Sequence, residues 1–144
     1  MPKLIFVNLP VADLERSIAF YQAVGAEQDH QFSDDTAACM LFSEVIHVMI
    51  LTHDKFRQFT PKRIADAHET SEVLIALSAD SRAEVDEFVA RAIAAGGREA
   101  RPAEDHGWMY GRAFEDPDGH IWEPFWMDVE AAAQAMAQPQ PADA

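Results

Sequence analysis

The carboxylate best placed to do chemistry in this sequence is Glu123, which lies inside the aromatic run Ile121-Trp122-Glu123-Pro124-Phe125-Trp126. A carboxylate in an apolar strand is costly unless it is paired, bound to a metal or turned toward a pocket. Glu123 is therefore a candidate general acid or base, or an anchor for a bound ligand. The alternatives are a solvated sheet face or an internal partner, for which Arg112 is the nearest candidate.

A second group of polar and aromatic side chains occupies residues 105–112. Trp108, Tyr110 and Arg112 alternate along a predicted strand, so they share one face of it. A hydroxyl and a guanidinium on one face can bind an oxygen-rich ligand. A structural salt bridge from Arg112 to a nearby carboxylate is the competing interpretation.

These candidate residues are positioned by a hairpin. Asp116-Pro117-Asp118-Gly119 is a turn sequence, because proline presets φ and glycine accepts the positive φ that closes the turn. The flanking residues 108–114 and 121–126 are rich in aromatic and branched side chains, which favours two strands.

The composition predicts a single globular domain. The chain has 144 residues, of which 49% are hydrophobic and 25% charged, and its one cysteine, Cys39, excludes an internal disulfide. No apolar run is long enough to span a membrane, and the first residues lack the layout of a signal peptide. We therefore expect a cytoplasmic protein.

The charge balance limits the partners. Eleven basic residues against 25 acidic ones give a net charge of −14, which repels nucleic acid and anionic membranes, so we expect neither as a partner. Four basic residues nevertheless gather between residues 55 and 63: Lys55, Arg57, Lys62 and Arg63. They either draw anionic ligands toward a site or belong to a solvated connector.

The predicted elements repeat. A strand, a helix and three strands are expected twice, and the second helix begins with the capping-box pattern Ser81-x-x-Glu84. We predict one domain over residues 1–128, followed by a tail over 129–144 that begins with a short helix. Within the domain, module one covers about 3–53, a linker about 54–70, and module two about 71–128.

Two segments carry a family resemblance. Residues 8–21, from Asn8-Leu9-Pro10 to Phe20-Tyr21, and residues 115–123 closely resemble the vicinal oxygen chelate superfamily, which includes glyoxalase I, extradiol dioxygenases and bleomycin-resistance proteins. The resemblance implies an α+β fold in which two tandem βαβββ modules form a curled mixed sheet around a cleft. It also implies a homodimer.

The same resemblance implies four positions for divalent-metal ligands, which fall here on Phe6, Ile50, Leu74 and Glu123. Only Glu123 has a donor atom, whereas a divalent ion needs at least three nitrogen or oxygen ligands. The neighbouring residues Asn8, Thr52 and Glu72 would add only a poor donor set. We therefore predict no metal cofactor.

The sequence thus favours a binding protein whose cleft holds a small aromatic or amphipathic molecule without the metal of the family. The alternative is a lyase or dioxygenase-type enzyme that uses Glu123 with a non-standard divalent site. The residues expected to line the cleft, besides Glu123, are Phe6, Asn8, Ile50, Leu74, Trp108, Tyr110 and Arg112.

Overall fold

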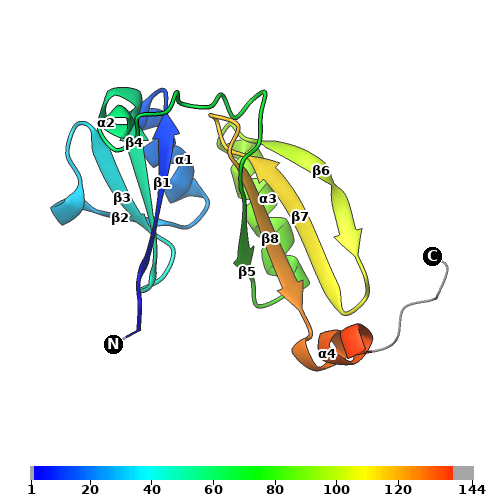
Figure 1. Cartoon of the computed structure of the whole chain (residues 1–144). Helices are drawn as coiled ribbons and strands as arrows, with labels where there is room; N and C mark the ends of the chain where they lie inside the picture. The colour runs from blue at the N-terminus through cyan, green and yellow to red at the C-terminus, as the bar shows by residue number, and fades with distance from the viewer. Residues whose placement is uncertain (1, 138–144) are drawn as a thin grey trace.

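The computed structural model describes residues 2–137, and the predicted repeat of one strand-helix-strand-strand-strand unit is confirmed (Figure 1). Module one contains β1 (Ile5–Val11), α1 (Leu14–Ala23), β2 (Glu27–Asp29), a 3-10 turn (His30–Phe32), β3 (Ala37–Leu41), β4 (Ile46–Thr52) and α2 (His53–Arg57). Module two contains β5 (Leu74–Ser78), α3 (Arg82–Ala94), β6 (Arg98–Asp105), β7 (Met109–Glu115) and β8 (Ile121–Met127), and α4 (Val129–Ala137) follows it.

The two modules have the same sheet topology. One four-stranded sheet has the order β1-β4-β3-β2, and the other has the equivalent order β5-β8-β7-β6. In each sheet the first strand of the module pairs in parallel with the last, and the remaining pairs are antiparallel. The expected α+β fold of two βαβββ modules with mixed sheets is therefore confirmed.

The helices begin where the sequence supplies a cap. Asp13 accepts a hydrogen bond from the backbone N–H of Arg16 at the start of α1, and Ser81 accepts one from Glu84 at the start of α3. The Glu84 carboxylate in turn accepts a hydrogen bond from the backbone N–H of Asp80. The predicted capping box is therefore present, except that this donor is one residue before the N-cap residue Ser81. Both helices end before a glycine with positive φ, at Gly25 and Gly96.

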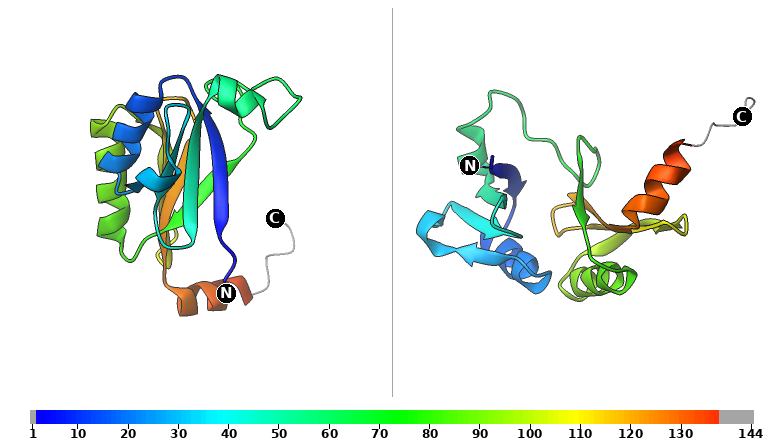
Figure 2. Two further views of the ribbon diagram at one scale, coloured as in Figure 1. Left: turned by 90° about the vertical axis from the view of Figure 1, so that its left-hand side faces the viewer. Right: turned by 90° about the horizontal axis from the view of Figure 1, so that it is seen from below.

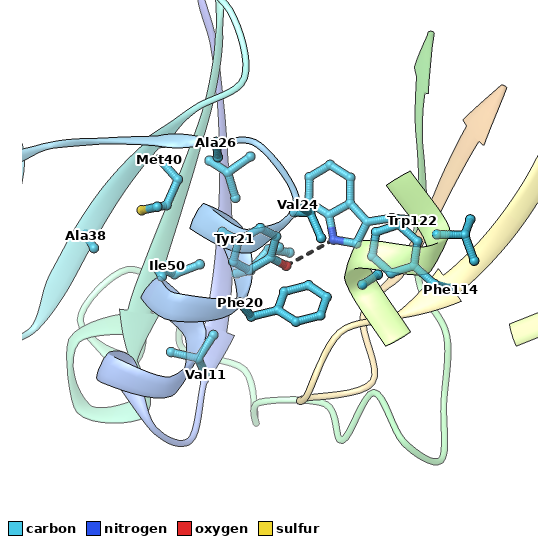
Figure 3. Close-up of a cluster of buried hydrophobic side chains, with 14 residues drawn as sticks. Val11, Phe20, Tyr21, Val24, Ala26, Ala38, Met40, Ile50, Phe114 and Trp122 are labelled. Carbon is cyan, nitrogen blue, oxygen red and sulfur yellow. Dashed lines mark hydrogen bonds between the residues drawn. The ribbon is translucent and has the colours of Figure 1, made fainter. Parts of the chain in front are cut away.

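One hydrophobic core joins the modules. The helices α1 and α3 lie on the same side of the sheets and contact each other (Figure 2). Phe20 and Tyr21 from α1 pack among Phe114 and Trp122 from the second sheet (Figure 3). Because these large side chains are almost fully buried, the core fixes the two modules relative to each other.

Polar contacts from the hairpin turn of module two reinforce this junction. The Asp118 carboxylate accepts a hydrogen bond of 2.8 Å from the backbone N–H of Ala12. His120 Nε2 lies 2.8 Å from the carbonyl oxygen of Pro10, so the imidazole donates to it. The turn that the sequence identifies as a hairpin connection thus also binds module one to module two.

The segment between the modules is more ordered than its sequence suggests. No period predicts a helix there, yet Thr52 caps the short helix α2 by accepting from the backbone N–H of Lys55. The short helix expected after residue 128 is present as α4, and residues 138–144 of the predicted tail lie outside the described residues. Within residues 2–137 no helix is long and apolar enough to cross a membrane.

Candidate functional site

Each sheet has one face against the shared core and one open face. In β1, Leu9 and Val11 point into the core, so the alternation of a strand turns Phe6 and Asn8 to the open side. Phe6 is 48% exposed and its ring lies 4.3 Å, centroid to centroid, from the imidazole of His47 on β4. Two of the residues predicted to line a cleft therefore share the open face of the first sheet.

Glu123 lies on the open face of the second sheet. Its neighbour Trp122 is buried in the core, and across the parallel pair with β5 Glu123 stands opposite Ala76. Leu74, two residues before Ala76, is on the same face and is 57% exposed. The surroundings of Glu123 on β5 are therefore apolar, as the sequence indicated.

The carboxylate of Glu123 nevertheless has a partner. Arg101 Nη2 on β6 donates a hydrogen bond of 2.7 Å to Glu123 Oε2, and 21% of the Glu123 side chain is exposed. The hypothesis that Arg112 is its internal partner is wrong. An ion pair this close to solvent contributes about 0.2–1 kcal/mol.

Arg112 and Tyr110 point to the other side of the sheet, against α3. Arg112 Nη1 lies 2.9 Å from Asp86 Oδ1 and its Nη2 lies 2.5 Å from Glu99 Oε2, while the Tyr110 hydroxyl donates to Asp86 at 2.6 Å. The hydrogen bond from Tyr110, followed by that from Arg112, lowers the pKa of the Asp86 carboxyl. The competing interpretation of a structural salt bridge therefore describes Arg112.

Trp108 stands apart from both of these groups. It precedes β7, and its ring stacks on His106 with 5.6 Å between centroids. Tyr110 instead pairs with Trp126 in the β7–β8 register. The guanidinium of Arg82 lies near both rings, 5.1 Å from the centroid of Tyr110 and 5.3 Å from that of Trp126. The structure therefore does not bring Trp108 or Tyr110 together with Glu123.

Ile50 is the clearest correction to the predicted set. It is fully buried in the core, because the β1–β4 register pairs it with the core residue Leu9. The same register pairs Asn8 with Met49, just as Ala76 pairs with Glu123 in module two. Met49, one residue earlier than expected, is thus the module-one equivalent of Glu123. The family resemblance placed this position on Ile50, one residue later. In a strand, a shift of one residue moves the side chain to the opposite face of the sheet.

The residues on the open faces do not fit the divalent metal that the resemblance implies. The corresponding positions hold Phe6, Met49, Leu74 and Glu123, and only the last offers an oxygen or nitrogen ligand. Among residues 2–137 no group of three or more His, Cys, Asp or Glu side chains is close enough to hold a metal ion. Within one chain, therefore, Glu123 lacks partners for a metal centre.

Two hollows lie between the modules, beneath residues 60–73. They have volumes of about 840 Å³ and 450 Å³, and they share a wall that includes Lys62, Arg63 and His120. Asn8 lines the smaller hollow, whereas Phe6, Leu74 and Glu123 line neither. Three of the four basic residues that gather between positions 55 and 63 in the sequence line the larger hollow: Arg57, Lys62 and Arg63.

Comparison with known proteins decides the family. The sequence profile of the glyoxalase/bleomycin resistance protein/dioxygenase superfamily matches residues 3–123. The chain belongs to this superfamily. The resemblance seen in residues 8–21 and 115–123 is thereby confirmed over nearly the whole domain. A search of curated proteins finds no match.

Solved structures agree with this superfamily assignment. A hypothetical protein from S. aureus shares 26% sequence identity with a TM-score of 0.74, covering 88% of this chain and 94% of the other. A glyoxalase/bleomycin resistance protein/dioxygenase family enzyme from Burkholderia phytofirmans PsJN is 20% identical, with a TM-score of 0.72 and coverages of 88% and 99%. The fosfomycin resistance protein FosX from Mesorhizobium loti is 21% identical, with a TM-score of 0.68 and coverages of 92% and 98%. These similarities support the superfamily fold.

Proposed function

We propose that this superfamily member binds a small aromatic or amphipathic molecule on the open face around Glu123, without a metal. The observation that carries the proposal is the set of side chains at the positions of the expected metal ligands. Phe6, Met49 and Leu74 are apolar there, and the one carboxylate, Glu123, is held by Arg101. Such a face offers apolar surface beside a charged acceptor, which is a usual composition of a small-molecule site.

We propose that a second copy of the chain completes this site by forming a homodimer. The first strands of both modules, β1 and β5, are free edges of their sheets. Large apolar side chains at the start of these strands or just before it are exposed: Leu4, Ile5, Phe6, Val73 and Leu74. Free edges with exposed apolar side chains are normally covered. A homodimer in which these edges are buried would turn the open faces into the walls of a cleft.

An enzymatic role for Glu123 with a non-standard metal is the weaker alternative. It requires at least two further donors near the carboxylate, whereas the register partner of Glu123 on β5 is Ala76 and the next residue of β5 on the same face is Leu74. The ion pair with Arg101 instead favours a carboxylate that acts as a hydrogen-bond acceptor for a ligand.

The test begins with a thermal-shift screen of small aromatic and amphipathic compounds, with and without a chelator, because a ligand that binds the folded state raises its melting temperature. Hits are then titrated by calorimetry into the wild type and Glu123→Gln. The variant should melt near the wild-type temperature and lose about 1.5–3 kcal/mol of binding free energy, the value of a hydrogen bond to a charged group.

Glu87→Gln is the matched control, because Glu87 also pairs with an arginine, Arg91 at 2.5 Å, but lies on α3, away from the open face. It should bind the hits as the wild type does. Binding that disappears with the chelator would contradict a metal-independent site. Equal affinities of Glu123→Gln and the wild type would remove Glu123 from the site.

A further inference from the structure

The two hollows beneath residues 60–73 differ in the chemistry of their linings: one is rich in cationic residues and the other is mainly apolar. The larger hollow is bordered by the cationic side chains Arg16, Arg57, Lys62 and Arg63 against only two carboxylates, Asp66 and Asp118. The smaller one is bordered mainly by apolar residues, among them Val7, Phe56, Ile64, Val73, Ile75 and Ile121, and within residues 2–137 Glu72 is the one acidic residue in its lining. Lys62 and Arg63 border both hollows, so a charged region adjoins an apolar one.

We propose that this paired hollow is a second binding site, which takes a small amphipathic anion: an apolar body in the smaller hollow and a phosphate or carboxylate beside Lys62 and Arg63. The smaller hollow adjoins the open face through Asn8 and Ile121, but Glu123 and Arg101 line neither hollow, so the site is distinct from the surroundings of Glu123. A local excess of cations is notable in a chain whose net charge is −14, since the surrounding surface would repel the same anion.

The charges of Lys62 and Arg63 are not neutralised by neighbours. Arg57 pairs with Asp54 at 2.7 Å, and Arg16 lies 3.7 Å from Asp118. Within residues 2–137, neither Lys62 nor Arg63 has a carboxylate oxygen within 4.0 Å. Two unpaired cations at the junction of a polar and an apolar hollow are the groups that an anion would contact first.

The wall of the hollow is held in place by its own contacts. Asp66 Oδ1 accepts a hydrogen bond of 2.9 Å from the backbone N–H of His68, and the Asp66 carbonyl accepts one of 2.9 Å from that of Thr70. This turn lies directly on Gly119, where a Cβ would come within 2.7 Å of the backbone of Ala67. The segment that covers the hollow is therefore docked on the hairpin turn of module two.

The experiment titrates phenyl phosphate into the full chain by calorimetry, with phenol and inorganic phosphate as the apolar and anionic halves alone. Phenyl phosphate should bind at least tenfold more tightly than either half, and its affinity should fall as salt is added. In Lys62→Gln/Arg63→Gln the affinity should drop about tenfold, because two charged contacts are lost.

Lys3→Gln/Arg91→Gln is the matched control, since it removes one lysine and one arginine that border neither hollow. It should retain wild-type affinity. Absence of phenyl phosphate binding, or an equal loss in the two double variants, would overturn the proposal. A loss in Glu123→Gln comparable with that in Lys62→Gln/Arg63→Gln would assign the anion to the open sheet face and also overturn it.

Discussion

Tyr21→Phe removes one hydroxyl from the buried junction of the modules. That hydroxyl donates a hydrogen bond of 2.5 Å to Asp116 Oδ2 and accepts one of 3.0 Å from Trp122 Nε1. Tyr21 is fully buried, Asp116 is 3% exposed and Trp122 is 1% exposed, so water cannot replace the lost partner. The substitution leaves one carboxylate oxygen and one indole N–H without a hydrogen bond while the ring packing is kept.

The magnitude follows from these two bonds. A hydrogen bond to a charged group contributes about 1.5–3 kcal/mol and a neutral one about 0.5–1.5 kcal/mol, so the free energy of unfolding should fall by about 2–4 kcal/mol. That is a large fraction of the roughly 5–15 kcal/mol that holds a typical domain folded. The contacts span 95 and 101 residues of sequence, so the loss reports on the junction and not on a local turn.

The effect should also depend on pH. Burial raises the pKa of Asp116, and the Tyr21 hydroxyl opposes that rise by stabilising the charged form. A carboxyl whose pKa is raised by folding contributes stability below its unfolded pKa, and this contribution is lost as the pH rises through the folded pKa. Without the hydroxyl the folded pKa rises further, so the variant should lose more stability at neutral pH than in acid.

Urea denaturation at several pH values measures both effects. Tyr110→Phe is the control, because it removes a comparable tyrosine–aspartate hydrogen bond of 2.6 Å at Asp86, where Arg112 remains as a partner and solvent is near. It should cost less than about 1 kcal/mol. A loss below about 1 kcal/mol in Tyr21→Phe, or one that is the same at every pH, would refute this reasoning.

Two further predictions concern the junction and the assembly. Gly119→Ala should lower the free energy of unfolding by about 1–3 kcal/mol in the same denaturation assay, because φ is +91° there and the new Cβ would lie 2.7 Å from the backbone of Ala67; wild-type stability would show that residues 67–68 are not docked on the turn. The chain should sediment as a dimer at micromolar concentration, because the apolar side chains on β1 and β5 are otherwise exposed, whereas a monomer there would contradict the proposed cleft.

The fold could be predicted because its signals are local. Helix caps such as Ser81, the Asp-Pro-Asp-Gly turn and the alternating strands each depend on a few neighbouring residues. They fixed the order of the elements and the repeat. The helix α2 was missed because it is a single capped turn, too short to show a period.

The site was harder to predict because alternation shows which residues share a face but not which face the helices cover. Tyr110 and Arg112 share a face as predicted, yet that face lies against α3 and Asp86. Ile50 was placed one residue from the correct position, Met49, and a shift of one residue exchanges core and surface. Arg101, the partner of Glu123, lies 22 residues away in sequence, and no local pattern indicates such a pair.

The most direct test of metal-independent binding is the metal content of the purified protein. Elemental analysis is carried out after incubation with zinc, nickel, manganese or iron and removal of the excess, on the wild type and on Glu123→Gln. The side chains Phe6, Met49 and Leu74 predict far less than one metal ion per chain, and no difference between the two proteins. One ion per chain in the wild type that is lost in Glu123→Gln would contradict the proposed function.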